Sequence, residues 1–138
     1  MIRRGLHSIA HGDGGSAVAE FVMVSALALL LGVGAFQLGL VLHVRNTLVA
    51  CAAEGARAGA RADASPADAR TRTRGMILAS LGAAYADQIE VSRRVTDQGV
   101  VVVEVQVTAP TPVIGLLGPT GTMTMTGRAF DEHPVAAP

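Results

Sequence analysis

A lone carboxylate, Glu20, stands directly before a long uncharged stretch of this 138-residue chain. No residue from Phe21 to Val44 carries a formal charge. A charged side chain at the edge of a membrane-spanning segment is costly, and by default it marks a functional position. A carboxylate in such a place can form an ion pair with an amine, which gains strength where water is scarce. Glu20 is therefore the first candidate for function; the alternative is a residue that only marks the edge of the span.

The single cysteine, Cys51, is a second candidate, because the sequence Leu-Val-Ala-Cys that it closes has the form of a bacterial lipobox. A lipoprotein signal needs an apolar core of about 7–15 residues that runs almost directly into the cysteine. Here the apolar run is longer, and His43, Arg45 and Asn46 lie between it and Cys51. We expect a small buried thiol, with lipidation as the alternative. One cysteine allows no intrachain disulfide.

The other polar residues form no recognisable catalytic or metal-binding pattern. The four histidines lack metal-ligand spacing, and neither a Gly-x-Ser-x-Gly motif nor a Walker loop is present. The sequence thus predicts no enzyme, no metal and no cofactor. The cationic side chains are all scattered arginines, balanced by equally many acidic residues. Without a basic patch interleaved with aromatics, nucleic acid is not an expected partner. The histidines are His7, His11, His43 and His133.

The uncharged stretch is long enough to cross a bilayer. As a helix, residues 21–44 would extend ~36 Å, slightly more than a hydrocarbon core of ~30 Å. Half of all residues are hydrophobic and the mean hydropathy is +0.43, yet aromatic residues make up only 3%. Such a chain lacks the bulky side chains that usually fill a large enzyme core. The sequence predicts one transmembrane helix and one small domain.

The helix is expected to continue past His43, because residues 45–64 contain no proline and many alanines. Small residues recur there every four positions, so they share one helix face. Such a face lets two helix backbones approach closely, as membrane helices do; the alternative is a simple bias of composition. The two neighbouring stripes are Cys51, Gly55 and Gly59, and Ala52, Ala56 and Ala60.

The residues after 64 predict a small α+β domain. Ser65, Pro66 and Asp68 are typical of a helix start, and we expect a helix over 66–86. Its expected apolar side consists of Met76, Ile77, Leu81 and Ala84. Strands are predicted at 88–95, 100–109 and 122–130. A hairpin connection at 96–99 joins the first two, and a loop at 110–121 rich in proline and glycine precedes the third.

Alternation along the second strand predicts which face is buried. Val101, Val103, Val105 and Val107 share one side, whereas Val102, Glu104, Gln106 and Thr108 share the other. The valine side should face the core. The expected fold class is therefore α+β: a long N-terminal transmembrane helix followed by a small domain of one helix and an antiparallel sheet. We expect this domain to span 65–130, with a frayed tail at 131–138.

Two short blocks give the chain a resemblance to a known family. In the first, Gly15 is followed by Glu20 and Phe21 at the fifth and sixth positions, which resembles the processing site of type IV prepilins. The second block lies beyond the uncharged stretch. Together the blocks resemble the TadE-like pseudopilins of tight-adherence (Flp, type IVb) pilus systems, over about residues 15–60. The family-motif residues are Arg45, Asn46, Glu54, Gly55, Ala56 and Arg57.

The resemblance implies a structural function in pilus assembly. A prepilin peptidase would cut between Gly15 and Ser16 on the cytoplasmic side, so that residues 1–15 are a leader and 16–64 remain as the transmembrane and extended helix. Glu20, followed by Phe21, would pair with the N-terminal amine of a neighbouring subunit. On a helix, positions 16 and 20 lie one turn apart. Implied partners are the peptidase, other pilins, pilus-assembly membrane proteins and membrane lipid.

The resemblance also decides the expected orientation. Arginines flank the uncharged stretch on both sides, so the positive-inside rule gives no clear answer. A prepilin leader would be cytoplasmic, which places the helix in the cytoplasmic membrane as a single pass and the domain outside the cytoplasm. The sequence alone leaves one competing function open: a membrane-anchored or lipidated extracytoplasmic binding module. The arginines are Arg3 and Arg4 on one side and Arg45, Arg57 and Arg61 on the other.

Overall fold

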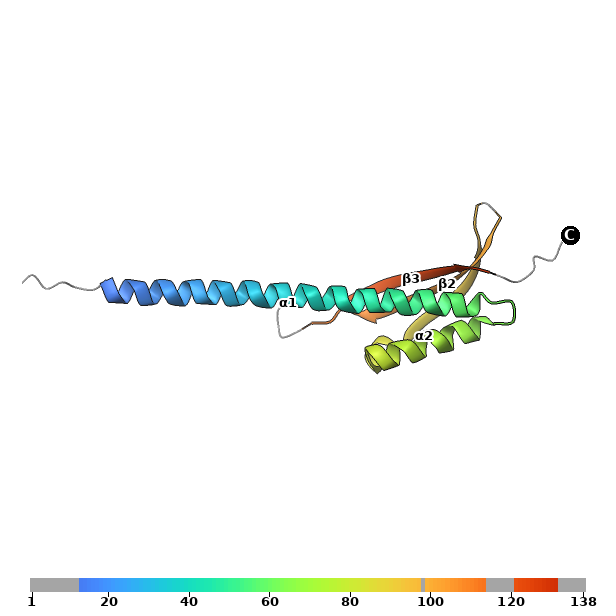
Figure 1. Cartoon of the computed structure of the whole chain (residues 1–138), viewed down its shortest axis with the longest axis horizontal. Coiled ribbons are helices and arrows are strands. Elements are labelled where there is room, and N and C mark those ends of the chain that lie inside the picture. The colour runs from blue at the N-terminus through green and yellow to red at the C-terminus, as the bar shows by residue number, and fades with distance from the viewer. Residues whose placement is uncertain (1–12, 98, 114–120, 132–138) are drawn as a thin grey trace, which may run out of the picture. The chain divides into compact units, whose positions relative to one another are not determined.

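The computed structural model describes residues 13–97, 99–113 and 121–131 (Figure 1). Its first element is helix α1, Asp13–Gly59, an unbroken helix of 47 residues. The chain divides into two compact units, Met1–Phe36 and Gln37–Pro138, and α1 contributes to both. The helix continues past His43, as predicted, and ends at Gly59, after which turns and bends lead to the second helix.

Within the first unit, every residue from Gly15 to Phe36 is exposed. The most apolar window of α1 has a mean hydropathy of 2.2, so the helix qualifies by length and composition as a candidate membrane span. Large apolar side chains cover it on all sides; Phe21, for example, is 72% exposed. Exposed apolar surface of this extent is rare on soluble monomers. The helix therefore suggests a single-pass membrane anchor.

Helix α2, Pro66–Ser80, starts where the sequence predicted. Ser65 is its N-cap, and the Ser65 hydroxyl accepts a hydrogen bond from the Asp68 backbone N–H at 3.3 Å. In return, the Asp68 carboxylate accepts from the Ser65 backbone N–H at 2.8 Å. This reciprocal capping box satisfies two backbone donors that a helix start leaves without partners.

The predicted end of α2 is wrong, because the helix stops at Ser80 and not at residue 86. The stop lies at Gly82, which adopts φ +95°, a conformation that glycine reaches without steric cost. The backbone N–H groups of Leu81 and Gly82 both donate to the Ile77 carbonyl, at 2.8 and 3.1 Å. A short 3-10 helix, η1 (Ala83–Tyr85), follows. Ala84 is exposed there and does not extend the apolar side of α2.

The three strands form one antiparallel sheet in the order β1-β2-β3. Strand β1 is Gln88–Val95, β2 is Val101–Pro110 and β3 is Thr122–Phe130. The first and third match the predicted ranges, and β2 begins one residue later than predicted and also includes Pro110. The α+β fold class, with its long N-terminal helix, is confirmed. In the register, Val105 lies between Val91 of β1 and Gly127 of β3.

Both helices cover the same face of this sheet (Figure 1). Val105 and Val107 of β2 are fully buried there, next to Val44 and Leu48 of α1 and Ile77 of α2. The predicted core face of β2 is therefore correct for these valines and for Val103, whereas Val101 is only half-buried.

On the opposite side of β2, Val102 and Glu104 are also buried, at 8% and 5% exposed, which the alternation did not predict. Their cross-strand neighbours account for the difference. Val102 lies opposite Phe130, and Glu104 forms ion pairs with Arg94 at 3.3 Å and Arg128 at 2.6 Å. These side chains of β1 and β3 lie beside the middle strand on that face and shield it from solvent.

Asp131, the first residue of the predicted tail, contacts the sheet. The Asp131 backbone N–H donates to the Val101 carbonyl at 3.0 Å, and the Asp131 carboxylate pairs with Arg93 at 2.9 Å. Arg93 also donates to the Ala64 carbonyl at 3.4 Å, so one side chain of β1 contacts both the α1–α2 turn and the end of β3. The rest of the predicted tail, 132–138, lies outside the described residues, as do leader residues 1–12.

Candidate assembly surface

The predicted processing residues lie at the start of α1. Gly15 and Ser16 are in its first turns, and Glu20 and Phe21 follow on the same helix. All four are exposed, and a side chain built on Gly15 would meet no atom within 4 Å. Among the residues that the structure describes, no cation lies within ion-pair distance of the Glu20 carboxylate. The Glu20 carboxylate is therefore available for a cation supplied from outside the described residues.

Gly55, in the second predicted block, brings α1 into close contact with α2. A Cβ placed on Gly55 would overlap the Thr73 hydroxyl and lie 3.0 Å from the Ala69 carbonyl oxygen. One turn later, a Cβ on Gly59 would collide with the Ala69 side chain. The predicted small-residue face thus does allow close approach, but to α2 of the same chain rather than to another membrane helix.

The adjoining alanine stripe is also buried inside the chain. Ala52 and Ala56 are 0% exposed and Ala60 is 3% exposed. Ala52 lies directly against Gly127 of β3, where a Cβ would overlap the Ala52 backbone. The two stripes therefore place α1 against α2 on one side and against the sheet on the other.

Glu54 and Arg57 flank this contact at the surface. Arg57 pairs with Glu54 at 2.9 Å, and Arg72 of α2 approaches the other Glu54 oxygen at 3.7 Å. The Arg57 side chain is 67% exposed and that of Glu54 is 35% exposed. Ion pairs as exposed as these contribute little to stability. Within the motif, Gly55 and Ala56 are therefore the structural residues, and the charged pair remains open to partners.

The motif residues Arg45 and Asn46 lie on the exposed side of α1. They belong to an outer face of the helix that the domain leaves uncovered, together with Leu42 and Val49, which are 45% and 39% exposed. Cys51 is on the inner face, where it is 2% exposed and belongs to the core cluster. The cysteine therefore has the environment of a small buried thiol, in the middle of an unbroken helix.

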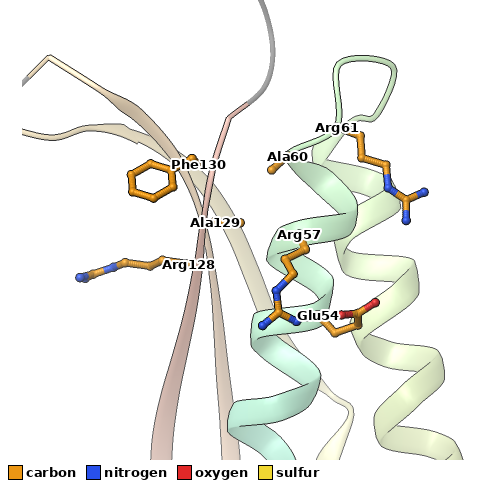
Figure 2. A pocket seen from close by; sticks show the side chains of 7 residues that line it. All are labelled: Glu54, Arg57, Ala60, Arg61, Arg128, Ala129 and Phe130. Carbon is orange, nitrogen blue, oxygen red and sulfur yellow. Dashed lines mark hydrogen bonds and ion pairs between the residues drawn. The ribbon is translucent and has the colours of Figure 1, made fainter.

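A shallow groove of about 510 Å³ lies between the end of α1 and β3. Figure 2 shows Glu54 and Arg57 on the α1 side, while Arg128 and Phe130 extend from β3 away from α1. Its polar side chains are three arginines and one glutamate. Arginine stays protonated at physiological pH, so this set can bind anions but offers no general base other than the ion-paired Glu54. The lining residues are Glu54, Arg57, Ala60, Arg61, Arg128, Ala129 and Phe130.

Two residues that shape this surface were not identified from the sequence. Gly127 carried a usable signal, because a glycine inside a strand pattern indicates close backbone approach. Gln37 is a polar side chain within an apolar helix, and its amide donates to the Pro112 carbonyl at 2.8 Å. Nothing in the local sequence indicates that partner, since the two residues are 75 positions apart.

Comparison with known proteins supports the predicted resemblance. Residues 15–57 match the family model described as TadE-like protein. No curated protein and no solved structure matches the chain significantly. The matched residues include the Glu20 region, the uncharged stretch and the α1 face that contacts α2 and β3. Residues 15–57, about a third of the chain, are therefore similar to the TadE-like family.

Proposed function

We propose that this protein is a minor pseudopilin that acts in assembly of a tight-adherence (Flp) pilus. In this proposal residues 1–15 are a cytoplasmic leader that a prepilin peptidase removes. Residues 16–64 anchor the protein in the cytoplasmic membrane and extend beyond it, and residues 65–130 lie outside the cytoplasm. Its partners are the peptidase, other pilins and membrane proteins of the assembly machinery.

One observation carries the proposal. A single unbroken helix, α1, contains both an exposed apolar segment preceded by Glu20 and a C-terminal half that forms one wall of the domain core. Lipid tails supply no hydrophobic drive between membrane helices, so assembly in the bilayer needs specific packing or polar contacts. A new amine at Ser16 and the carboxylate of a neighbouring Glu20 would supply such a contact in a setting where ion pairs are strong.

The chemistry of the described residues favours assembly over catalysis. The groove beside β3 holds three arginines and a glutamate that is already paired with one of them, Arg57. The outer face of α1 instead offers Arg45 and Asn46 beside exposed apolar side chains. A face that combines apolar area with a few polar groups is suited to packing against another helix. We therefore assign the outer face of α1, from Leu38 to Val49, to contacts with other subunits.

Processing is the step that tests the proposal most directly. Intact-mass analysis of protein extracted from membranes should show a chain that begins at Ser16 in cells that contain the peptidase. Gly15→Leu should keep the leader, because the peptidase would no longer find a small residue at the cleavage site. Gly32→Leu is the matched control, since a side chain on Gly32 also meets no atom within 4 Å. A mature protein that retains Met1 in such cells would rule the proposed processing out.

A further inference from the structure

The side chain of Gln37 fixes a distant segment to α1. Its Nε2 donates to the Pro112 carbonyl at 2.8 Å, and Gln37 is only 9% exposed. Pro112 belongs to the segment Pro110–Val113 at the end of β2, which we call the β2-end segment. Its base is closed by the Thr111 backbone N–H, which donates to the Gly121 carbonyl at 2.9 Å. The β2-end segment is therefore held beside α1 at the level of Gln37.

The length of the uncharged stretch determines where Gln37 lies relative to a bilayer. A hydrocarbon core of ~30 Å takes about 20 helical residues. Counted from Phe21, the residue after Glu20, such a span ends at about Leu40. Centring the span between Glu20 and Arg45, the charged residues on either side, also leaves Gln37 inside it. In either placement the compact unit that starts at Gln37 begins before the apolar layer ends.

A glutamine at this depth needs a partner, because the bilayer core has no water to satisfy an amide. The Pro112 carbonyl supplies one, and the same bond satisfies that carbonyl. On the uncovered side of α1, Leu38 and Leu42 remain 60% and 45% exposed. In the β2-end segment, the Thr111 N–H and the Pro112 carbonyl are thus hydrogen-bonded within the protein, as backbone groups at membrane depth need to be.

The distribution of charge distinguishes the two ends of the sheet. No aspartate, glutamate, lysine or arginine occurs between Glu104 and Arg128 in the sequence, so β2 reaches Pro112 without a charge to desolvate. The opposite end, at the β1–β2 connection, carries Arg93, Arg94 and Asp97. Asp87, just ahead of β1, is an acidic residue at the same end of the sheet as Pro110. It forms no ion pair with another described residue, so its carboxylate limits immersion to the level of the lipid headgroups.

We propose that the β2-end segment is a lipid-contacting surface, immersed at the edge of the outer leaflet beside α1. The inference rests on the membrane anchoring in the proposed function. Val113, which is 37% exposed, would contact acyl chains near the headgroups. Two contacts with the bilayer, α1 and the β2-end segment, then fix the position of the domain relative to the membrane surface, whereas α1 alone would provide a single attachment.

Site-specific quenching of a fluorescent label tests this proposal. The full chain, with Cys51→Ala, carries one new cysteine at Val113 or at Val100. These valines lie just beyond the two ends of β2 and are 37% and 41% exposed. The labelled protein is reconstituted into vesicles of phosphatidylethanolamine and phosphatidylglycerol with brominated acyl chains. We expect several-fold stronger quenching by the brominated lipid at position 113 than at position 100, and the reverse order with aqueous iodide. Equal quenching at the two positions would overturn the proposal.

Two further measurements distinguish a failure of the membrane anchoring from a failure of the lipid contact alone. If alkaline carbonate releases the protein from membranes, the anchor itself fails, and with it the proposed function. If the protein stays inserted while the label at 113 is quenched by iodide in vesicles, only the lipid contact fails. Protection from iodide at 113 in native membranes but not in vesicles would assign the surface to a protein partner and overturn the lipid proposal.

The hydrogen bond can be tested by itself. Gln37→Leu keeps α1 apolar but releases the β2-end segment, so quenching by the brominated lipid at position 113 should fall while insertion is retained. Gln106→Leu on β2 is the matched control, because Gln106 is half-buried and lies in the sheet away from the β2-end segment; it should leave the quenching unchanged. Unchanged quenching in Gln37→Leu would contradict the role given to Gln37.

Discussion

Gly127 of β3 lies directly against the backbone of Ala52 in α1, with no room for a side chain between them. Gly127 is also the cross-strand neighbour of Val105, which is 0% exposed. The helix therefore contacts the sheet beside the middle of its most buried strand. Because the backbones of Gly127 and Ala52 are in close contact, the short side chains on this face of α1 can pack densely against the sheet.

Gly127→Ala should destabilise the domain, because a Cβ there overlaps backbone atoms that cannot move aside independently. Overpacking of this kind typically costs roughly 1–3 kcal/mol. Thermal unfolding of the full chain in detergent, followed by circular dichroism, measures the change. Gly75→Ala is the matched control: Gly75 is exposed in α2 with no atom within 4 Å, so alanine should stabilise the helix by about 0.5–1 kcal/mol. Equal effects of the two substitutions would contradict the close contact.

Gly55→Ala should destabilise the α1–α2 contact for a related reason, again by roughly 1–3 kcal/mol. The nearest obstacle is the Thr73 hydroxyl, which itself donates to the Ala69 carbonyl at 2.8 Å. Removing that hydroxyl in Gly55→Ala/Thr73→Ala should recover part of the lost stability. A double-mutant cycle measures the coupling between the two positions. Strict additivity would show that the two residues do not meet.

The capping box gives α2 a defined response to acid. Hydrogen bonds from the Ser65 hydroxyl and then the Ser65 backbone lower the pKa of Asp68 below its usual 3.8. A lowered pKa in the folded state means that ionised Asp68 stabilises the fold above pH 3.8, and that this contribution is lost as the pH falls through the folded-state pKa. The melting temperatures of the native protein and Asp68→Asn should therefore differ near neutral pH and converge in acid. A constant difference would contradict this.

Glu20→Ala tests whether the apolar helix assembles with other subunits or only anchors the protein. Loss of a charge makes insertion easier, so the variant should be processed and inserted normally, yet support few or no pili and fail to cross-link to other pilus components. Glu20→Asp should retain part of the function, because only one methylene of reach is lost. Ser25→Ala, an exposed polar position in the same helix, is the control. Normal pilus counts with Glu20→Ala would exclude the assembly role of Glu20.

Local signals predicted most of the fold. The start of α2 could be predicted because Ser65, Pro66 and Asp68 act within one turn of each other. The strands could be predicted because β-branched residues alternate along the chain. The end of α2 could not be predicted in this way, because the apolar pattern continues to Ala84, beyond the glycine stop signal at Gly82.

Long-range contacts could not be predicted in the same way. The small-residue stripe of α1 showed that something approaches closely, but the sequence did not say whether the partner was another membrane helix or α2 of the same chain. Burial of Glu104 depends on Arg94 and Arg128 of the two flanking strands. These ion pairs form only when the register of the three strands places the side chains beside one another. The Gln37–Pro112 bond, which carries the further inference, is of the same kind.

In the proposed function, α1 belongs both to the membrane and to the domain core, and this sharing constrains the order of biosynthesis. Residues 37–59 are translated early and supply Val44, Leu48 and Ala52 to the core, whereas the strands that cover them emerge last. With α1 anchored as proposed, the sheet would fold onto a helix that is already held in the membrane. A fragment that starts after Gly59 would lack this wall and leave Val105 and Val107 uncovered, as an aggregation-prone face. If α1 is the proposed anchor, its insertion would precede completion of the domain, because residues 37–59 are synthesised before the strands that pack on them.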